Sequence, residues 1–337
     1  MNRFDYVSAA SVDHAIGLLQ ADPSAQLLAG GTNLVDLLKY DIAKPTKLVG
    51  IRHLPLRGIV ETERGLRLGA LASNTDIAYH PLVVDRYPIL ASAILAGASA
   101  QLRNVATAGG NLLQRTRCAY FYDVGTACNK RIPGSGCPAR TGLSRNHAIL
   151  GASESCIATH PSDMCVALAA LDAVVIVKGP GGEREIPFAR LHRLPGATPH
   201  EETALGHSDV IVAIELPAPI DAVGHSYLKI RDRLSYAFAL VSVAALVKVE
   251  EGRITFARAA LGSVAHKPWR NPEAETLLIG RPPDHATFTA FAAEVLRTAT
   301  AQRENGFKIE LARRALVRCL GQAAAGTPQS QSDKRVR

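Results

Sequence analysis

Apolar positions recur with helical spacing in some segments of the first hundred residues and as short continuous runs in others, which predicts alternating helices and strands. Behind Ser11, the stripe Ala15, Ile16, Leu18 and Leu19 predicts a capped amphipathic helix. Apolar runs predict strands at 26–29, 47–51 and 66–71, and residues 33–39 predict a second short helix. An alanine-rich periodic segment predicts one longer helix over 89–102.

The apolar period disappears between residues 115 and 155, where Gly, Pro, Arg and Cys dominate. A loop of roughly forty residues inside a compact domain needs a physical reason. An embedded metal cluster would supply one, because metal–ligand bonds can replace a missing apolar core.

After this gap the pattern returns. Ser162 is suited to cap a helix that runs to Ala170, and strands are predicted at 173–177 and 210–216 before a boundary at 217–219. Strands at 226–230, 236–249 and 254–261, followed by helices at 287–300 and 307–320, predict a separate α+β domain. We expect the polar tail, 326–337, to be disordered.

Composition excludes several classes of protein. With 337 residues and 47% hydrophobic content the chain is long enough for two or three domains with a large core, and it is not a disordered sequence. It has no apolar run long enough for a transmembrane helix, and residues 1–11 have no apolar region of a classical export signal.

The net charge of +8 is unevenly distributed, because seven basic residues and one acid lie between Arg103 and Arg145. This stretch fits a solvated basic face, an anionic ligand or an acidic partner. Nucleic acid is disfavoured, because aromatic residues make up only 5% of the chain and none interleave with the charges.

Two segments join small residues, paired glycines and an asparagine. The segment from Leu27 to Leu34 reads LLAGGTNL, and the segment from Ala106 to Leu113 reads ATAGGNLL. Successive backbone amides at such a turn can bind a phosphate or diphosphate. Each segment alone fits an ordinary strand–turn–helix corner equally well, but two of them could hold a dinucleotide from both ends.

A third glycine-rich string, from Gly134 to Ala139, matches the spacing of the dinucleotide-binding fingerprint. No strand pattern precedes it and no helix pattern follows it, so the required context is absent. We therefore reject this string, and with it a Rossmann-type NAD site.

Four of the six cysteines, Cys118, Cys128, Cys137 and Cys156, fall in the aperiodic stretch at separations of ten, nine and nineteen positions. Four thiolates suit an iron–sulfur cluster or Zn²⁺, and the spacing alone also permits no metal. Nearby arginines and lysines would offset the negative charge of a tetrathiolate cluster. Cys165 and Cys319 fall in helical patterns and are interpreted as core thiols.

Two further segments carry both an ordinary and a functional interpretation. Ser162 and Asp163 suit a helix cap and the helix dipole, but Asp163 could also lie near a ligand. His160 in the same turn fits a surface histidine or a ligand contact. Residues 229–233, KIRDR, fit a charged strand edge, whereas the sharper interpretation places Lys229 over an anionic or electron-rich ring.

Taken together, the LAGGTNL, TAGGNL, PSD and KIRDR segments resemble the FAD-binding subunits of the xanthine dehydrogenase (molybdenum hydroxylase) family, from about Tyr6 to Leu320. The insertion from Cys118 to Cys156, LQRTRC before it and VAHKPWR at 264–270 look like the branch with the flavin subunit of the bacterial periplasmic aldehyde oxidoreductase. That subunit carries a [4Fe-4S] cluster beside its FAD, and a similar insertion occurs in 4-hydroxybenzoyl-CoA reductase.

The resemblance implies an α+β fold: a two-subdomain FAD-binding fold of the vanillyl-alcohol-oxidase (PCMH-like) type plus an α+β C-terminal domain. The expected domains are 1–60, 61–220 with an iron–sulfur insertion at 115–157, and 221–325, before the tail. The implied ligands of the [4Fe-4S] cluster are Cys118, Cys128, Cys137 and Cys156. The implied FAD contacts are Leu27, Leu28, Ala29, Gly30, Gly31, Thr32, Asn33, Leu34, Ala106, Thr107, Gly110, Asn111, Leu113, Gln114, Asp163, Ile211 and Lys229.

In that family a molybdenum-cofactor large subunit oxidises the substrate, a small subunit with two [2Fe-2S] clusters relays electrons, and FAD delivers them to an external acceptor. The resemblance therefore implies an oxidoreductase subunit of an aldehyde-oxidising heterotrimer, with no catalytic base of its own. The missing nicotinamide fingerprint and the insertion near the flavin predict independence of NAD, and the composition predicts no nucleic-acid or membrane partner. It also implies a periplasmic location through a signal-bearing partner, with the cytoplasm as the alternative. A structural zinc-binding subunit without redox activity and a stand-alone FAD oxidase are the competing hypotheses.

Overall fold

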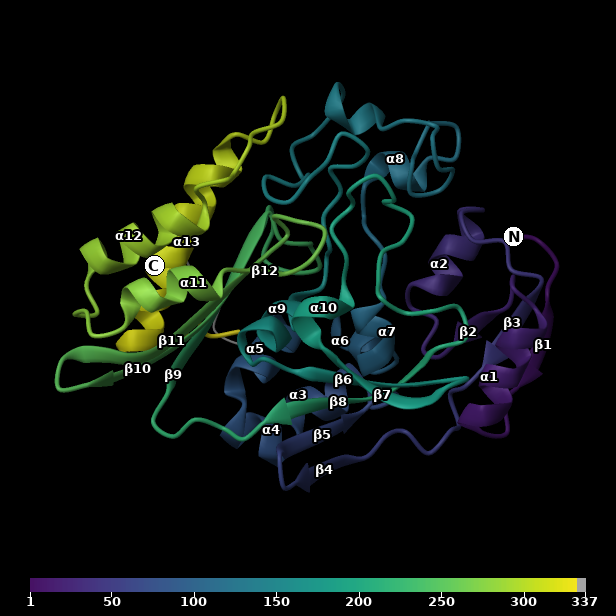
Figure 1. Cartoon of the computed structure of the whole chain (residues 1–337), viewed down its shortest axis with the longest axis horizontal. Helices are drawn as coiled ribbons and strands as arrows, with labels where there is room; N and C mark the ends of the chain where they lie inside the picture. The colour runs from purple at the N-terminus through teal and green to yellow at the C-terminus, as the bar shows by residue number, and fades with distance from the viewer. Residues whose placement is uncertain (332–337) are drawn as a thin grey trace.

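The computed structural model of this protein describes residues 1–331 and builds them around three β-sheets (Figure 1). Residues 332–337 of the predicted tail lie outside the described residues. The sheets follow one another along the chain, and the second sheet begins at Ile59, two residues before the expected start of the second domain at 61. In the described part of the chain, no helix combines the length and apolar character needed to span a membrane.

The N-terminal unit is a small parallel sheet with strand order β1-β3-β2 and two helices. Its elements are β1 (Asp5–Ser8), α1 (Val12–Ala21), β2 (Gln26–Leu28), α2 (Leu34–Lys39) and β3 (Lys47–Gly50). The predicted cap of α1 is confirmed, because the Ser11 hydroxyl accepts a hydrogen bond from the His14 amide at 3.0 Å. The pattern did not predict β1.

The second unit is an antiparallel five-stranded sheet with strand order β4-β5-β8-β6-β7. Its strands are β4 (Ile59–Thr62), β5 (Gly65–Gly69), β6 (Val174–Gly179), β7 (Gly182–Pro187) and β8 (Val210–Pro217). Its helices are α3 (Asn74–Tyr79), α4 (Pro81–Arg86), α5 (Pro88–Ala96), α6 (Ala100–Arg103), α7 (Ala108–Leu112), α9 (Asp163–Ala170) and α10 (Phe188–Leu191).

The single helix predicted over 89–102 is wrong, because the chain breaks between α5 and α6. Gly97 is extended and Ala98 has a φ of +51°. At the break, the carbonyls of Ala96 and Gly97 do not continue the helix. They accept hydrogen bonds from the side chains of Lys229 and Arg103, respectively. Contacts with distant side chains thus override the helical propensity of the alanine-rich segment.

The predicted aperiodic insertion is confirmed as irregular. Between residues 115 and 157 the described chain forms only the short helix α8 (Ala119–Tyr122) and the 3₁₀ turn η1 (Pro138–Arg140). It lies at the top of the view in Figure 1, above the second unit. It returns to the fold where the amides of Ile149 and Leu150 bond to the Val264 carbonyl at 2.9 and 3.0 Å.

The C-terminal domain is an antiparallel sheet, with strand order β12-β11-β10-β9, covered by helices. Its elements are β9 (Gly224–Ile230), β10 (Val241–Glu250), β11 (Arg253–Gly262), β12 (Trp269–Arg270), α11 (Pro272–Glu275), η2 (Thr276–Leu278), α12 (His285–Val295) and α13 (Phe307–Ala324). The expected strand from residue 236 begins only at Val241, because 231–240 form a loop.

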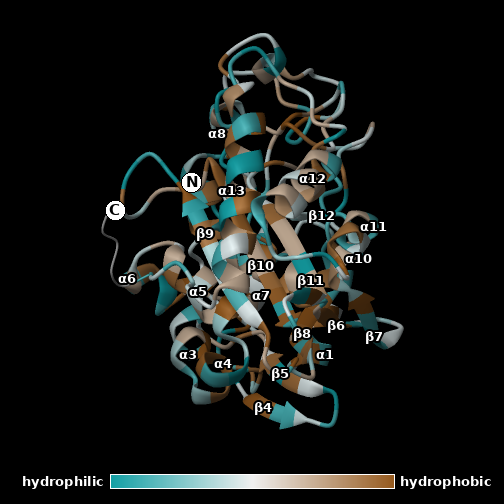
Figure 2. Ribbon diagram, turned by 90° about the vertical axis from the view of Figure 1, so that its left-hand side faces the viewer, coloured by the Kyte–Doolittle hydropathy of each residue, from teal (hydrophilic) through white to brown (hydrophobic). Residues whose placement is uncertain are grey.

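Strand β10 joins the C-terminal domain to the second unit. Val243 and Ala245 belong to the core under α12 and α13, whereas Ala244 and Leu246 belong to the core that contains α5 and α9. Both faces of the strand are therefore buried, which explains its continuous apolar sequence, and Figure 2 shows the apolar colouring gathered in these inner elements.

The described part of the predicted disordered tail lies against β9 instead of leaving the fold. The Gln329 amide bonds to the Ser226 hydroxyl at 3.3 Å, and the Gln331 side-chain amide donates to the Tyr227 carbonyl at 3.1 Å. These two hydrogen bonds attach the segment to β9, although the segment lacks apolar residues that could pack there.

Candidate functional site

The two glycine segments meet in space, although about seventy positions separate them in the sequence. Gly31 adopts a φ of +74°, which favours glycine, and a Cβ atom built on Gly30 would overlap the Val105 carbonyl oxygen. The Asn33 side-chain oxygen accepts a hydrogen bond from the Arg115 amide at 3.0 Å, just beyond the second segment. The predicted pair of turns is therefore one structural unit.

The second segment forms the helix α7 that the sequence pattern described only as a turn. Thr107 caps it by accepting a hydrogen bond from the Gly110 amide at 3.3 Å. The Asn111 side-chain oxygen accepts from the Ser162 hydroxyl at 2.7 Å, and the Gln114 side-chain amide donates to the Asn111 carbonyl at 3.1 Å. These contacts fix the position of both side chains.

Beside the joined turns lies a cavity of about 1260 Å³, which we call the central cavity. It lies between the glycine turns, α5, α9, the cysteine-rich insertion and the loop after β9. Its volume exceeds the usual range for a small-molecule pocket and suits an extended ligand. Among the predicted FAD contacts, those in its wall are Thr32, Asn33, Ala106, Gly110, Asn111, Gln114, Asp163 and Lys229.

The remaining predicted FAD contacts stand in the elements that support this wall. Leu27 and Leu28 are half-buried in β2, Ile211 is buried in β8, and Leu113 is 40% exposed. Ala29, Gly30, Gly31 and Leu34 form the first turn and the start of α2, and Thr107 caps α7. The structure thus divides the predicted set into wall residues and supporting residues.

Three polar residues in the wall were not identified as site residues from the sequence. Asn74 Oδ1, Arg103 Nε and Arg117 Nε are buried and have no hydrogen-bond partner among the described residues. A buried polar atom normally has a partner, so these atoms indicate a polar ligand in the cavity. In the sequence, Asn74 could have been found only through Ser73, the helix-capping residue that precedes it. The two arginines appeared there only as members of the basic stretch.

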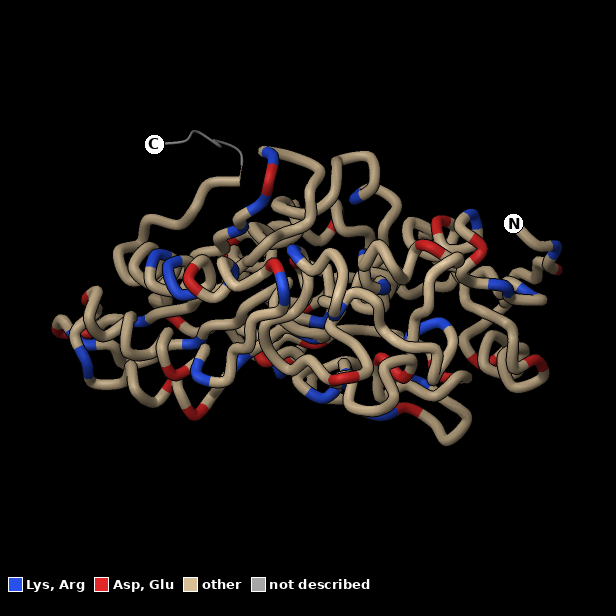
Figure 3. Tube along the Cα trace, turned by 90° about the horizontal axis from the view of Figure 1, so that it is seen from above, with Lys and Arg blue, Asp and Glu red and all other residues tan. Residues whose placement is uncertain are grey.

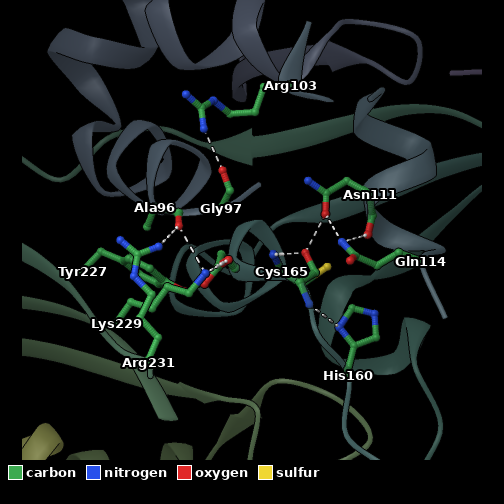
Figure 4. A network of polar contacts seen from close by, with 12 residues as sticks. Ala96, Gly97, Arg103, Asn111, Gln114, His160, Cys165, Tyr227, Lys229 and Arg231 are labelled. Atoms are coloured by element: carbon green, nitrogen blue, oxygen red, sulfur yellow. Dashed lines mark hydrogen bonds and ion pairs between the residues drawn. The ribbon is translucent and has the colours of Figure 1, made fainter. Parts of the chain in front are cut away.

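A buried ion pair in the wall of the cavity joins α9 to β9. Lys229 Nζ lies 2.8 Å from Asp163 Oδ2, both side chains are less than 10% exposed, and Tyr227 donates to Asp163 Oδ1 at 2.6 Å (Figure 4). Burial, together with Asp163, holds the pKa of Tyr227 well above its ordinary value. Residues 229–233 are therefore not simply a charged edge, since Lys229 is buried and also donates to the Ala96 carbonyl at 3.1 Å.

His160 is buried rather than on the surface. His160 Nε2 and His192 Nε2 lie 3.3 and 2.8 Å from the Leu112 carbonyl oxygen at the end of α7. Burial lowers the pKa of His192 to about 4 and that of His160 well below its ordinary value, so both rings are neutral at pH 7. Two neutral N–H donors satisfy the two lone pairs of one carbonyl and hold the end of α7.

These two rings and Cys165 also form the one group of three metal-ligand atoms within 4.8 Å of one another that the described residues contain. Burial raises the pKa of Cys165 to about 12, so its thiol remains protonated. The ring nitrogens Nε2 already face the Leu112 carbonyl. We therefore interpret Cys165 as the predicted core thiol and the histidines as support for α7.

The four cysteines of the insertion line one small cavity, which we call the cysteine cavity. All four thiols are free of disulfide bonds, and Cys128 and Cys156 are buried. Burial raises the pKa of Cys118 to about 11, whereas a hydrogen bond with Cys156 lowers the pKa of Cys137 to about 6. The hydrogen bond with Cys137, together with burial, raises the pKa of Cys156, and the charge of Lys130, a wall residue only 5% exposed, offsets part of this rise.

Basic residues around this cavity form ion pairs with acidic residues elsewhere in the same chain. Arg115 and Lys130 approach Glu202 at 2.6 and 3.4 Å, and Arg117 approaches Asp36 at 2.6 Å. Basic and acidic positions are interspersed over the whole trace (Figure 3). These ion pairs tie the irregular insertion to the surrounding units, which accounts for much of the local basic excess.

The sequence matches known families over most of its length. Residues 2–219 match the FAD binding domain in molybdopterin dehydrogenase, and residues 226–323 match the CO dehydrogenase flavoprotein C-terminal domain. The aldehyde oxidoreductase FAD-binding subunit PaoB of Escherichia coli (strain K12) is 50% identical over 328 residues, 96% of this chain and 99% of that protein. The carbon monoxide dehydrogenase medium chain of Hydrogenophaga pseudoflava is 27% identical over 88% of this chain and 84% of its own length.

Solved structures show the same fold. A carbon monoxide dehydrogenase chain from Hydrogenophaga pseudoflava superposes with a TM-score of 0.75 at 26% identity, covering 96% of this chain and 97% of that chain. A chain of quinoline 2-oxidoreductase from Pseudomonas putida 86 superposes with a TM-score of 0.75 at 25% identity, covering 97% of this chain and 98% of that chain. The expected α+β fold with an FAD-binding portion and a C-terminal domain is therefore confirmed.

Proposed function

This chain belongs to the family of FAD-binding subunits of molybdenum-containing hydroxylases, and on that premise we propose that its central cavity holds FAD while its four clustered cysteines hold a [4Fe-4S] cluster. Membership makes the chain an FAD-binding oxidoreductase subunit with an electron-transfer role. The assignment of individual residues and of the cluster is our proposal. The observation that carries it is that two separate cavities adjoin, one lined by the glycine turns and one by four thiols.

The residues of the central cavity fit FAD. The joined turns offer backbone amides to the diphosphate, as such turns do in other dinucleotide sites. The unpaired Arg103 Nε and Arg117 Nε offer donors to its oxygen atoms, and Asn74 Oδ1 offers an acceptor. Lys229, held by Asp163, supplies positive charge in the cavity wall. FAD would contribute reversible two-electron chemistry, whereas the chain binds and orients it.

The residues of the cysteine cavity fit a [4Fe-4S] cluster better than a single Zn²⁺ ion. Tetrahedral zinc with bonds of about 2.3 Å draws its four sulfur atoms to separations of about 3.8 Å. Among the described residues, no three of these cysteine sulfurs form a group with mutual distances within 4.8 Å. The wider arrangement suits a larger centre, and the buried Lys130 offsets its negative charge.

The partners follow from the family and from the relatives. We propose that this chain assembles with a molybdenum-cofactor large subunit and a [2Fe-2S] small subunit as a heterotrimer, and that electrons leave through its FAD to an external acceptor other than NAD. The 50% identical relative is named as a subunit of an aldehyde oxidoreductase, which supports an aldehyde as the substrate of the complex. We further propose a periplasmic location through a signal-bearing partner, with a cytoplasmic one as the alternative.

The test is to purify the chain with its co-purifying subunits and assay FAD, iron and acid-labile sulfide. The proposal expects one FAD released on denaturation, iron and sulfide in equal amounts, and no stoichiometric zinc. Cys128→Ser should lose iron while keeping most FAD, because Cys128 lines the cysteine cavity but not the central cavity. Cys319→Ala, which removes a buried thiol of the C-terminal core, is the control that should keep both.

Three outcomes would contradict the proposal. A colourless complex without FAD would refute the central-cavity assignment. Stoichiometric zinc without sulfide would favour the structural zinc subunit. Turnover of an aldehyde by this chain without other subunits would favour a stand-alone FAD oxidase, which would need its own substrate base.

A further inference from the structure

The central cavity and the cysteine cavity share part of one wall. Cys118 and His147 line both of them, so these two residues separate the proposed FAD site from the proposed cluster site. Cys118 stands at the start of α8, directly after the second glycine segment and its following loop. Of the four cysteines, Cys118 therefore lies on the side of the flavin.

The two side chains are in direct contact. His147 Nε2 lies 3.1 Å from Cys118 Sγ, and His147 Nδ1 is buried without a hydrogen-bond partner among the described residues. A metal-bound thiolate carries no proton and can only accept a hydrogen bond. In the cluster-loaded protein, the hydrogen in this contact must therefore belong to His147 Nε2.

His147 is held by the C-terminal domain. Its carbonyl oxygen accepts hydrogen bonds from Lys308 Nζ at 2.9 Å and from Asn305 Nδ2 at 3.1 Å. Lys308 is fully buried and also donates to the Ser263 carbonyl at 2.7 Å. The backbone of His147 is thus anchored at the start of α13, which fixes the direction of its ring toward Cys118.

From this geometry we propose that His147 is a positioning residue that donates an N–H···S hydrogen bond to the flavin-side cluster ligand, Cys118, and thereby raises the reduction potential of the cluster. The inference rests on the proposed [4Fe-4S] site. The physical reason is that a reduced cluster carries more negative charge on its sulfur atoms, so an N–H donor stabilises the reduced form more than the oxidised form.

The experiment is a redox titration of the cluster in the whole complex, followed by electron paramagnetic resonance. His147→Phe removes the donor and should shift the midpoint potential of the cluster to a lower value, with iron, sulfide and FAD contents unchanged. His147→Gln keeps an N–H donor and should recover part of the shift. His266→Phe is the matched control, because His266 is a buried histidine whose ring nitrogens have no hydrogen-bond partner among the described residues.

A potential that is the same in His147→Phe and His266→Phe, at full iron content, would overturn the inference. If His147→Phe fails to assemble its cluster, the wild-type complex with ¹⁵N-labelled histidine decides the matter. Pulsed resonance should detect one weakly coupled histidine nitrogen at the reduced cluster, and this coupling should vanish in His147→Gln but persist in His266→Phe. Its absence from the wild type would refute the hydrogen bond, whereas a complex without iron and sulfide would refute the cluster itself.

Discussion

The central cavity and the cysteine-rich insertion are adjacent but are built in opposite ways. The wall of the central cavity is made by capped helices, strand ends and glycine turns of the regular fold. The insertion, 115–157, has one short helix and one 3₁₀ turn, and its small apolar cluster of Leu37, Phe121 and Cys128 includes one of the proposed metal ligands. One site is preorganised by secondary structure, and the other would be held by thiolate bonds to the proposed cluster.

This difference predicts how each region responds to damage. A preorganised cavity should be sensitive to its buried polar contacts and close backbone approaches, whether or not its ligand is present. If the insertion holds the proposed cluster, an insertion with little core of its own should be sensitive chiefly to loss of that cluster.

The largest effect is expected from breaking the buried ion pair in the central cavity. Lys229→Met would leave the Asp163 carboxylate buried with Tyr227 alone, which should cost about 3–5 kcal/mol of stability. Urea unfolding, followed by FAD release, measures this loss. Lys248→Met removes a lysine from the more exposed pair with Glu250 and should cost less than about 1 kcal/mol. Equal losses in the two variants would contradict the central role of the buried pair.

The close approach of the two glycine turns gives the second prediction. Gly30→Ala places a methyl group against the Val105 carbonyl and should cost about 1–3 kcal/mol and weaken FAD binding. Thermal unfolding and FAD titration measure both effects. Gly17→Ala, on the exposed side of α1 with no atom near the added Cβ, should be neutral or stabilising by up to about 1 kcal/mol. If the Gly30→Ala protein bound FAD with normal affinity, the two turns could move apart without loss of FAD binding.

Removal of iron tests the insertion. Chelation under oxidising conditions should raise the rate of proteolytic cleavage within 124–145 by about tenfold, equivalent to roughly 1.4 kcal/mol of local stability. Cleavage in β10, buried on both faces, should not change. Mass spectrometry of the fragments gives both rates in one experiment. An insertion that stays resistant without iron would show that its ion pairs alone hold it.

The last prediction concerns acid stability near pH 6.5, where the expected effect is only a fraction of RT, well below about 1 kcal/mol. His266 lies in the segment against which the insertion packs. Burial holds the pKa of His266 well below its ordinary value of 6.5, so the folded state stays unprotonated while the unfolded state gains a proton as the pH falls below about 6.5. Stability from this group is therefore complete above pH 6.5 and decreases toward acid. His266→Phe should reduce the slope of stability against pH below 6.5 by about 1.4 kcal/mol per pH unit. An unchanged slope in pH-dependent unfolding would exclude this contribution.

Much of the fold follows from local sequence patterns, because helix caps and strand alternation act over a few residues. Ser11 and Ser162 cap helices as predicted, and the aperiodic stretch of the insertion is irregular. The helix over 89–102 could not be predicted correctly, since its break at Gly97 serves contacts with Lys229, more than 130 positions away. The spacing of apolar residues within a segment contains no information about a contact with a residue so far away in the sequence.

The sequence by itself determined the glycine turns, the four cysteines and the family to which the chain belongs, because these are properties of residue type and order. Only the tertiary structure decided that the two turns touch, that Asn74 and Arg103 line the central cavity and have buried atoms without a partner among the described residues, and that His160 is buried. It also decided that Cys118 and His147 form the wall between two cavities. The physical reason is that burial and contact depend on packing between distant segments, which a linear pattern does not specify.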